Sequence, residues 1–326
     1  MNTTELLENM TDRGKFERLA NAILGKVNSD YDAVIVFGLN AQDETIRGPN
    51  DGFCQVPGKK PAHFVWVQHT TTDRGRLENK WLCEDVEKLG DLLKAGRSVQ
   101  ALKADFPDGV FTLVLSTNQR LPSESLAADV YKRASQLGVW VDIWEQSRYA
   151  RFLDTDSAGQ YLRKTYLGTD AQMLSEELLA ELGYKSLEQY RQLQFTDPTA
   201  WVSRELEKRI VDEPGTRFFG VKFLVGESGF GKSAAAYRFL VEHLESGRCG
   251  IYVPDQVVEN SVSIHDAVWQ TLSKLCPTLL SEEISKITGV IPDGSQLAMV
   301  VDDINQRYCQ MLWIDRSSAH PQGPHR

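Results

Sequence analysis

An eight-residue stretch in the second half of the chain has the pattern of a phosphate-binding loop. It matches GxxxxGK[ST] at every fixed position, follows the apolar run 218–226 and precedes the predicted helix 234–246. Its glycines let backbone N–H groups close around a phosphate without a steric clash, and the helix N-terminus adds partial positive charge. The eight residues are Gly226, Glu227, Ser228, Gly229, Phe230, Gly231, Lys232 and Ser233.

The chemistry expected of this loop is the binding of ATP with Mg²⁺. Lys232 is placed to reach the β- and γ-phosphates, and the Ser233 hydroxyl is placed to ligate the metal. Such a loop also needs an acid at the end of a neighbouring strand. Asp302 and Asp303 follow one apolar run, and Asp315 follows another. We prefer the adjacent pair, with Asp302 as a metal ligand, because two carboxylates can supply both a ligand and a base.

The first part of the chain contains a second set of residues that could bind a metal. Asp51 lies beside a predicted turn in the Gly/Pro/Asn/Asp-rich segment 44–56, and Gln68 follows the apolar run 64–67. Carboxylate and amide oxygens on neighbouring strands suit Mg²⁺, which a nuclease holds against the scissile phosphate. Glu17, on a predicted helix, could add a third oxygen ligand.

A nuclease site of this kind also uses a lysine that positions or activates the attacking water. The residue at the expected place, just beyond the amide on the same strand, is Thr70. Lys80, on the following predicted helix, is the preferred replacement, whereas Lys59 and Lys60 in the preceding hairpin loop are weaker candidates. We interpret His69 as a strand-end side chain and not as a general base.

These residues need a scaffold, and the hydrophobic pattern predicts an α/β one. Up to about residue 150 the order is helix, three strands, helix, strand, helix and strand, which is typical of a mixed sheet with flanking helices. A helical pattern follows, and the α/β pattern then returns. The predicted regions are a domain with the candidate nuclease site over 1–152, a helical connector over 153–213, an incomplete P-loop NTPase domain over 214–316 and a disordered tail over 317–326.

The composition limits the classes of protein to which the chain can belong. Its 326 residues are 41% hydrophobic and 25% charged, which is typical of a globular protein. No apolar run approaches the length of a membrane span, and the N-terminus lacks the pattern of a signal peptide, so we expect a cytoplasmic protein. The five scattered cysteines argue against a zinc site and a disulfide framework. The net charge of -9 means that DNA binding requires a local basic groove.

The first 150 or so residues resemble the PD-(D/E)XK nuclease superfamily in its Mrr-like branch, in which glutamine often replaces the second acid. The resemblance implies a restriction-endonuclease-like mixed sheet and DNA as the substrate. It also implies that Glu17, Asp51, Gln68 and Lys80 are catalytic, with Asp51 and Gln68 as Mg²⁺ ligands. The segments that carry it are Phe16-Glu17, Gly48-Pro49-Asn50-Asp51-Gly52, Gln68-His69-Thr70, Ser116-Thr117-Asn118 and Val141-Asp142-Ile143-Trp144.

The order of a nuclease-like module, a connector and an NTPase resembles that of bacterial STAND NTPases of the AVAST antiviral type, and Val300–Asn305 resembles their second acidic motif. The resemblance implies that ATP binding favours a homo-oligomer in which the N-terminal effector domains come together and cleave DNA. We expect the C-terminal sensor region of that family to be missing, because the residues after Asp315 have no foldable pattern. Two alternatives stay open, namely a nucleotide-binding scaffold whose N-terminal domain only binds DNA or a partner, and a catalytically silent fragment.

Overall fold

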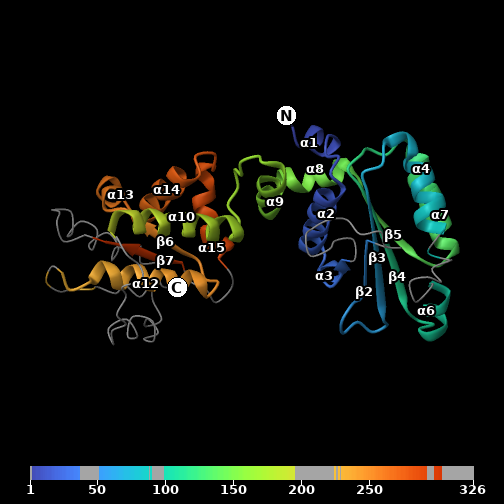
Figure 1. The fold of residues 1–326 in the computed structure, drawn as a ribbon, viewed down its shortest axis with the longest axis horizontal. Helices are drawn as coiled ribbons and strands as arrows, with labels where there is room; N and C mark the ends of the chain where they lie inside the picture. Colours follow the sequence, from blue (N-terminus) through green and yellow to red (C-terminus); the bar gives the residue numbers. More distant parts are fainter. Residues whose placement is uncertain are drawn as a thin grey trace, which may run out of the picture. The chain divides into compact units, whose positions relative to one another are not determined.

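The computed structural model describes residues 2–36, 51–87, 89, 99–194, 224, 227, 229–291 and 297–302, with 193 and 194 described by their backbone alone. The chain divides into two compact units, Met1–Asp170 and Ala171–Arg326, whose elements are labelled in Figure 1. The boundary falls inside the segment 153–213 that the sequence predicts as a connector. The helices of that segment therefore belong partly to unit 1 and partly to unit 2.

Unit 1 is built on a five-stranded sheet with the strand order β1-β2-β3-β4-β5. The pairs β1–β2 and β2–β3 are antiparallel, whereas β3–β4 and β4–β5 are parallel. The predicted α/β class with a mixed sheet and flanking helices is confirmed. The strands are β1 (Ile35–Val36), β2 (Gly52–Gln55), β3 (His63–Thr70), β4 (Val110–Thr117) and β5 (Trp140–Trp144).

Helices cover both faces of this sheet, with α2 on one side and α4 and α7 on the other (Figure 1). Val65 and Val67 of β3 pack in a cluster with α2 and α8, whereas Phe64 and Trp66 pack in a cluster with α4 and α7. Such alternation is expected of a strand that is buried on both faces. The helices are α1 (Thr3–Glu8), α2 (Arg13–Val27), α3 (Ser29–Asp32), α4 (Leu77–Asn79), α6 (Val99–Asp105), α7 (Glu124–Gln136), α8 (Gln146–Thr155) and α9 (Ser157–Leu167), together with a 3-10 turn η1 (Arg74–Arg76) and a π-helical segment η2 (Lys80–Val86) that continues α4.

Two local features fix the backbone around Asp51 and the start of α2. Asp12 caps α2, because its carboxylate accepts a hydrogen bond of 3.0 Å from the Lys15 N–H. Gly52, the first residue of β2, allows close approach of the chain, since a Cβ there would lie 2.5 Å from Val34 Cγ1. The start of α2 and the start of β2 are therefore both set by the residue types at these two positions.

Unit 2 contains the two-stranded parallel sheet β6–β7, with residues of α10 and α12 packed against it. The predicted strand 218–226 lies outside the described residues except for Leu224, and Asp303, Asp315 and the tail 317–326 lie outside them as well. Within the described part of the chain, no helix combines the length and apolar character needed to cross a membrane. The elements of unit 2 are α10 (Glu176–Gln194), α12 (Lys232–Glu245), β6 (Gly250–Val253), α13 (Asp255–Asn260), α14 (Ile264–Leu275), the 3-10 segment η3 (Ser281–Lys286), α15 (Ile287–Val290) and β7 (Ala298–Val301).

Candidate functional site

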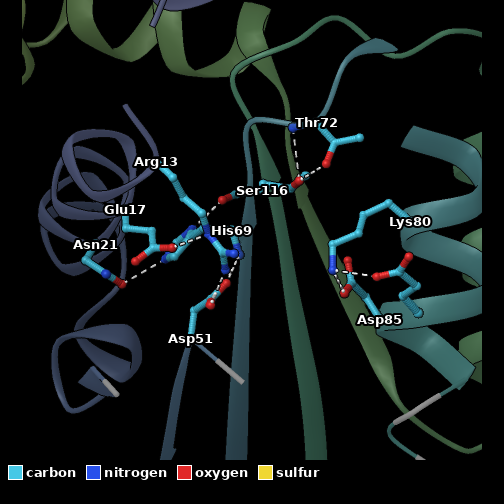
Figure 2. A network of polar contacts seen from close by, with 11 residues as sticks. Arg13, Glu17, Asn21, Asp51, His69, Thr72, Lys80, Asp85 and Ser116 are labelled. Carbon is cyan, nitrogen blue, oxygen red and sulfur yellow. Dashed lines mark hydrogen bonds and ion pairs between the residues drawn. The ribbon is translucent and has the colours of Figure 1, made fainter. Parts of the chain in front are cut away.

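Asp51 lies at the centre of a polar network at one end of the unit 1 sheet (Figure 2). Its backbone N–H donates to the Val67 carbonyl at 3.2 Å, which extends the pairing of β2 and β3 by one residue. One carboxylate oxygen accepts a hydrogen bond of 2.6 Å from the backbone N–H of His69, and the other accepts one of 2.8 Å from Arg13. The carboxylate is thus fixed by β3 on one side and by α2 on the other.

Glu17 reaches the same guanidinium from the next turn of α2. Its Oε1 accepts a hydrogen bond of 2.7 Å from Arg13 Nε, and the side chain is buried. The other oxygen, Oε2, is also buried and has no hydrogen-bond partner among the described residues. Burial, with a further contribution from the negative charge of Asp51, raises the pKa of Glu17 to about 7, while Arg13 acts in the opposite direction. The structure therefore brings together two of the predicted metal-site carboxylates, with a cation between them.

Lys80 and Asp85 form a second polar group on the other side of the strands (Figure 2). The Lys80 ammonium donates to Asp85 at 2.9 Å and to Glu84 at 3.2 Å. Burial raises the pKa of Asp85 to about 6, Lys80 opposes that rise, and the charge of Asp51 adds to it. The negative charge of Asp51 thus contributes to the raised pKa of both carboxylates, Glu17 and Asp85.

The sequence does not predict the position of Asp85, because that position depends on the local helix type. In an α-helix successive residues turn by about 100°, so residues five apart point in different directions. The segment η2 is π-helical, with i to i+5 hydrogen bonding, which places Lys80 and Asp85 on one face. In the sequence, this pairing corresponds only to an acid five positions after the lysine. The α-helical pattern pairs residues three or four apart and therefore does not predict it.

Gln68 and Thr70 follow the alternation of β3 and lie on the face opposite to His69. Gln68 is half-buried and pairs with Leu115 of β4 in the strand register. The Thr70 hydroxyl donates to Thr72 Oγ1 at 2.7 Å and accepts from the Thr72 N–H at 3.1 Å, so it closes the turn after β3. The position of the expected lysine thus holds a turn-forming hydroxyl.

The other two candidate lysines lie at the wrong end of β3 for this site. Lys59 forms an ion pair of 2.7 Å with Asp30, and both Lys59 and Lys60 belong to the hairpin loop before His63, the first residue of β3. At about 3.3 Å per residue, five strand residues separate His63 from Gln68 by roughly 17 Å. Lys80 lies instead after the C-terminal end of β3, in η2, where it pairs with Asp85.

His69 is completely buried and joins three elements of unit 1. Its Nδ1 contacts the Ser116 hydroxyl of β4, and its Nε2 lies 3.1 Å from Asn21 Oδ1 of α2. The neutral ring with a proton on Nε2 satisfies both contacts, because Ser116 can then donate to Nδ1. Burial lowers the pKa of His69 to about 4, so the ring is neutral at neutral pH. Ser116 is fully buried as well, so a Ser–His nucleophile at this place has no access to substrate.

The candidate phosphate loop in unit 2 has the backbone that its glycines predict. Gly229 and Gly231 have φ values of 83° and 70°, in the left-handed region that favours glycine. Gly231 is the N-cap of α12, which begins at Lys232. The Lys232 ammonium donates to the Glu227 carbonyl at 2.9 Å, so it lies over the loop. Of the eight predicted loop residues, Gly226 and Ser228 lie outside the described part of the chain.

Tyr190 of α10 connects Asp302 to this loop. Its hydroxyl lies 2.8 Å from Asp302 Oδ2 and 2.9 Å from the carbonyl oxygen of Ser233, so the acid after β7 lies near the first turn of α12. The ring of Tyr190 is buried and stacks on Tyr252, with centroids 4.1 Å apart. The sequence does not predict this role for Tyr190, because a tyrosine in a predicted helical connector has the pattern of an ordinary core residue.

Among the described residues, no three His, Cys, Asp or Glu side chains are grouped so that they could hold a metal ion. The unit 1 network offers two carboxylates bridged by a guanidinium, and unit 2 offers Ser233 and Asp302 near a shared tyrosine. No model of a known protein family matches the chain, and no curated protein matches it either. The geometry of these two groups is therefore what indicates a function.

Proposed function

We propose that the chain is a Mg²⁺-dependent DNA endonuclease under the control of ATP, and that it is the effector and NTPase part of a bacterial antiphage defence protein. Unit 1 would carry the nuclease site, and unit 2 would carry the nucleotide site. The observation that carries the proposal is the position of Asp51, whose carboxylate shares the Arg13 guanidinium with the buried Glu17 and accepts the backbone N–H of His69.

The residues of unit 2 fit an ATP–Mg²⁺ complex. The hydroxyl of Ser233 and the carboxylate of Asp302 are hard oxygen donors of the kind that Mg²⁺ prefers. Lys232 donates a hydrogen bond to a backbone carbonyl of its own loop. Phosphate oxygens of a bound nucleotide can take the place of this carbonyl and accept charge-assisted hydrogen bonds from the lysine. When bound, Mg²⁺ neutralises phosphate charge and orients the nucleotide.

The residues of unit 1 fit a hard divalent cation in their chemistry. Glu17 and Asp51 offer carboxylate oxygens, and Glu17 Oε2 is buried without a hydrogen-bond partner among the described residues. Mg²⁺ at such a site polarises a phosphodiester and activates water. Lys80 would stabilise negative charge near the scissile phosphate, a role that Thr70 cannot fill because its side chain is neutral.

The alternative proposal is a nucleotide-binding scaffold whose unit 1 binds DNA or a partner without cleaving it. Three features of unit 1 favour this function. Thr70 stands in place of a lysine, Lys80 is engaged by two carboxylates, and Arg13 occupies both Glu17 and Asp51. A nuclease fold that has lost its chemistry would show these features as well.

Plasmid cleavage by the whole protein tests the two functions against each other. We expect supercoiled DNA to be cut in the presence of Mg²⁺ and ATP, and we expect Asp51→Ala and Lys80→Ala to abolish the cutting. Asp108→Ala and Lys132→Ala are matched controls, since both side chains are exposed on unit 1. Intact plasmid with Mg²⁺, Mn²⁺ or Ca²⁺ in every nucleotide state would favour the scaffold over the nuclease.

A further inference from the structure

Arg13 places a single guanidinium between two carboxylates that come from different elements. Its Nε lies 2.7 Å from Glu17 Oε1, and its Nη2 lies 2.8 Å from Asp51 Oδ1. The Arg13 side chain is 49% exposed, whereas the side chains of Glu17 and Asp51 are 1% and 5% exposed. The carboxylates are therefore fixed in the protein interior, and the cation between them can reach water.

The charges of this group do not balance. When both carboxylates are ionised they carry two negative charges, and Arg13 supplies one positive charge. A buried carboxylate pair is costly unless cations and hydrogen bonds compensate it. The remaining imbalance is visible at Glu17 Oε2, which is buried and has no hydrogen-bond partner among the described residues. A divalent cation would balance the pair fully.

We propose that Arg13 occupies the cation position of the Glu17–Asp51 site, so that a divalent cation binds there only by displacing the guanidinium. This inference rests on the proposed nuclease function and describes how its metal loading is regulated. The displaced guanidinium moves into water at small cost, because the Arg13 side chain is already half-exposed. Arg13 thus stabilises the metal-free protein and lowers its affinity for the metal.

Removing the guanidinium has opposite effects under this inference and under an ordinary structural ion pair. A structural ion pair predicts that Arg13→Gln destabilises the protein and leaves metal affinity unchanged or weaker. Competition predicts that Arg13→Gln destabilises the metal-free protein but binds a divalent cation more tightly. Arg13→Lys keeps the charge and loses the two-armed geometry, so competition predicts an intermediate affinity.

The test is a titration of the full chain with Mn²⁺, without nucleotide, followed by the electron paramagnetic resonance signal of the free ion. We expect Arg13→Gln to bind Mn²⁺ at least about tenfold more tightly than the unchanged chain, because a positive charge in contact with the site is removed. Lys15→Gln removes an exposed charge from the same helix and should leave the affinity unchanged. Adding Asp51→Asn to Arg13→Gln should remove the gain.

Equal or weaker Mn²⁺ binding by Arg13→Gln, in protein whose circular dichroism is unchanged, would overturn the inference. A gain that survives Asp51→Asn would overturn it too, because the ion would then be bound elsewhere. If Arg13→Gln does not fold, the Mn²⁺ affinity of Arg13→Lys is the deciding measurement. An Arg13→Lys protein that binds Mn²⁺ no more tightly than the unchanged chain would contradict the inference. Plasmid cleavage separates the two proposals. Tighter Mn²⁺ binding by Arg13→Gln without any plasmid cleavage would contradict only the proposed nuclease function. Plasmid cleavage without tighter Mn²⁺ binding by Arg13→Gln would contradict only the competition between Arg13 and the metal.

Discussion

The two candidate sites differ in how much of the chain is needed to build them. In unit 2 the candidate phosphate loop and the start of α12 are continuous in sequence, and the hydroxyl of Tyr190 connects the start of α12 to Asp302. In unit 1 the network around Asp51, the residue before β2, draws on residues from α2, β3 and β4. A local motif can find the first kind of site, whereas the second exists only once the sheet and α2 are assembled.

The sites also differ in their electrostatics. Unit 1 buries carboxylates and compensates them with cations of its own, Arg13 and Lys80. Unit 2 has positive groups at its candidate loop, namely the Lys232 ammonium and the N-terminus of α12. Such groups favour the binding of an anion. Unit 1 is therefore proposed to bind a cation, and unit 2 a phosphate. Substitutions in unit 1 should therefore affect folding, and those in unit 2 should affect ligand binding.

The largest effect is expected from His69→Ala in unit 1. The change removes a buried ring and leaves Ser116 and Asn21 without their partner. It should lower the free energy of unfolding of unit 1 by about 3–4 kcal/mol. Urea unfolding followed by circular dichroism measures it, with His265→Ala, an exposed histidine of unit 2, as the control. A loss below about 0.5 kcal/mol, the usual range of surface substitutions, would mean that the network does not hold unit 1 together.

Lys232→Ala tests the opposite behaviour in unit 2. Loss of charge-assisted hydrogen bonds to phosphate should weaken ATP binding by about 100-fold, or about 2.7 kcal/mol. Titration calorimetry with ATP and Mg²⁺ measures the affinity, and thermal unfolding of unit 1 should not change. Lys274→Ala, an exposed lysine of α14, serves as the matched control. If Lys232→Ala binds ATP as tightly as the unchanged chain, the prediction that residues 226–233 bind phosphate is wrong.

A pH series on Glu17→Gln sharpens the electrostatic side of the comparison. The pKa of Glu17 is raised from 4.5 to about 7, so the folded protein holds this proton more tightly than the unfolded chain. The stability that Glu17 contributes is therefore fully present below pH 4.5 and is lost as the pH rises through 7. Between pH 5 and pH 8, the unchanged chain should lose about 2 kcal/mol of unfolding free energy relative to Glu17→Gln.

Comparison with the variant isolates Glu17, because the opposite pH dependence of His69 is present in both proteins. The pKa of His69 is lowered to about 4, so its contribution is lost as the pH falls from 6.5 through 4. Urea unfolding at several pH values measures the difference, with Glu8→Gln as a control for an exposed carboxylate. Parallel pH curves for the unchanged chain and Glu17→Gln would contradict the raised pKa.

The smallest effect is expected from Tyr190→Phe. The change keeps the stacking on Tyr252 and removes the hydroxyl contact to Asp302 and Ser233. Loss of one hydrogen bond to a carboxylate should weaken ATP binding in the presence of Mg²⁺ by about tenfold, or about 1.4 kcal/mol. Binding without Mg²⁺ should change less, because Asp302 is proposed to act through the metal. If ATP binding weakens equally with and without Mg²⁺, Tyr190 acts on the candidate phosphate loop and not through Asp302.

The sequence was a good guide where the physical rule is local. The burial of β3 on both faces follows from the apolar run 64–67, and the left-handed glycines of the loop follow from their positions in the motif. The sequence predicts that Glu17 and Asp51 come together, but not the Arg13 guanidinium that lies between them. Arg13 is an unremarkable residue of the first turn of α2 until β2 brings Asp51 to it.

Asp85 and Tyr190 escaped prediction for the same reason, since each acquires its role from a contact that residue spacing does not encode. Asp85 depends on a π-helical turn, and Tyr190 depends on the packing of α10 against the start of α12. The strand 218–226 stays a prediction, because it lies outside the described residues apart from Leu224. The unit boundary at Asp170 was also beyond sequence reasoning, because helical periodicity is the same on both sides of it.

The π-helical segment Lys80–Val86 sets the spacing of its ion pair at five residues instead of four. An α-helix brings residues four apart onto one face. Deleting one residue between Lys80 and Asp85 would therefore let the segment close as an α-helix with the lysine and the acid still on one face. Inserting a residue there would turn them apart, so the pair tolerates a loss of length but not a gain.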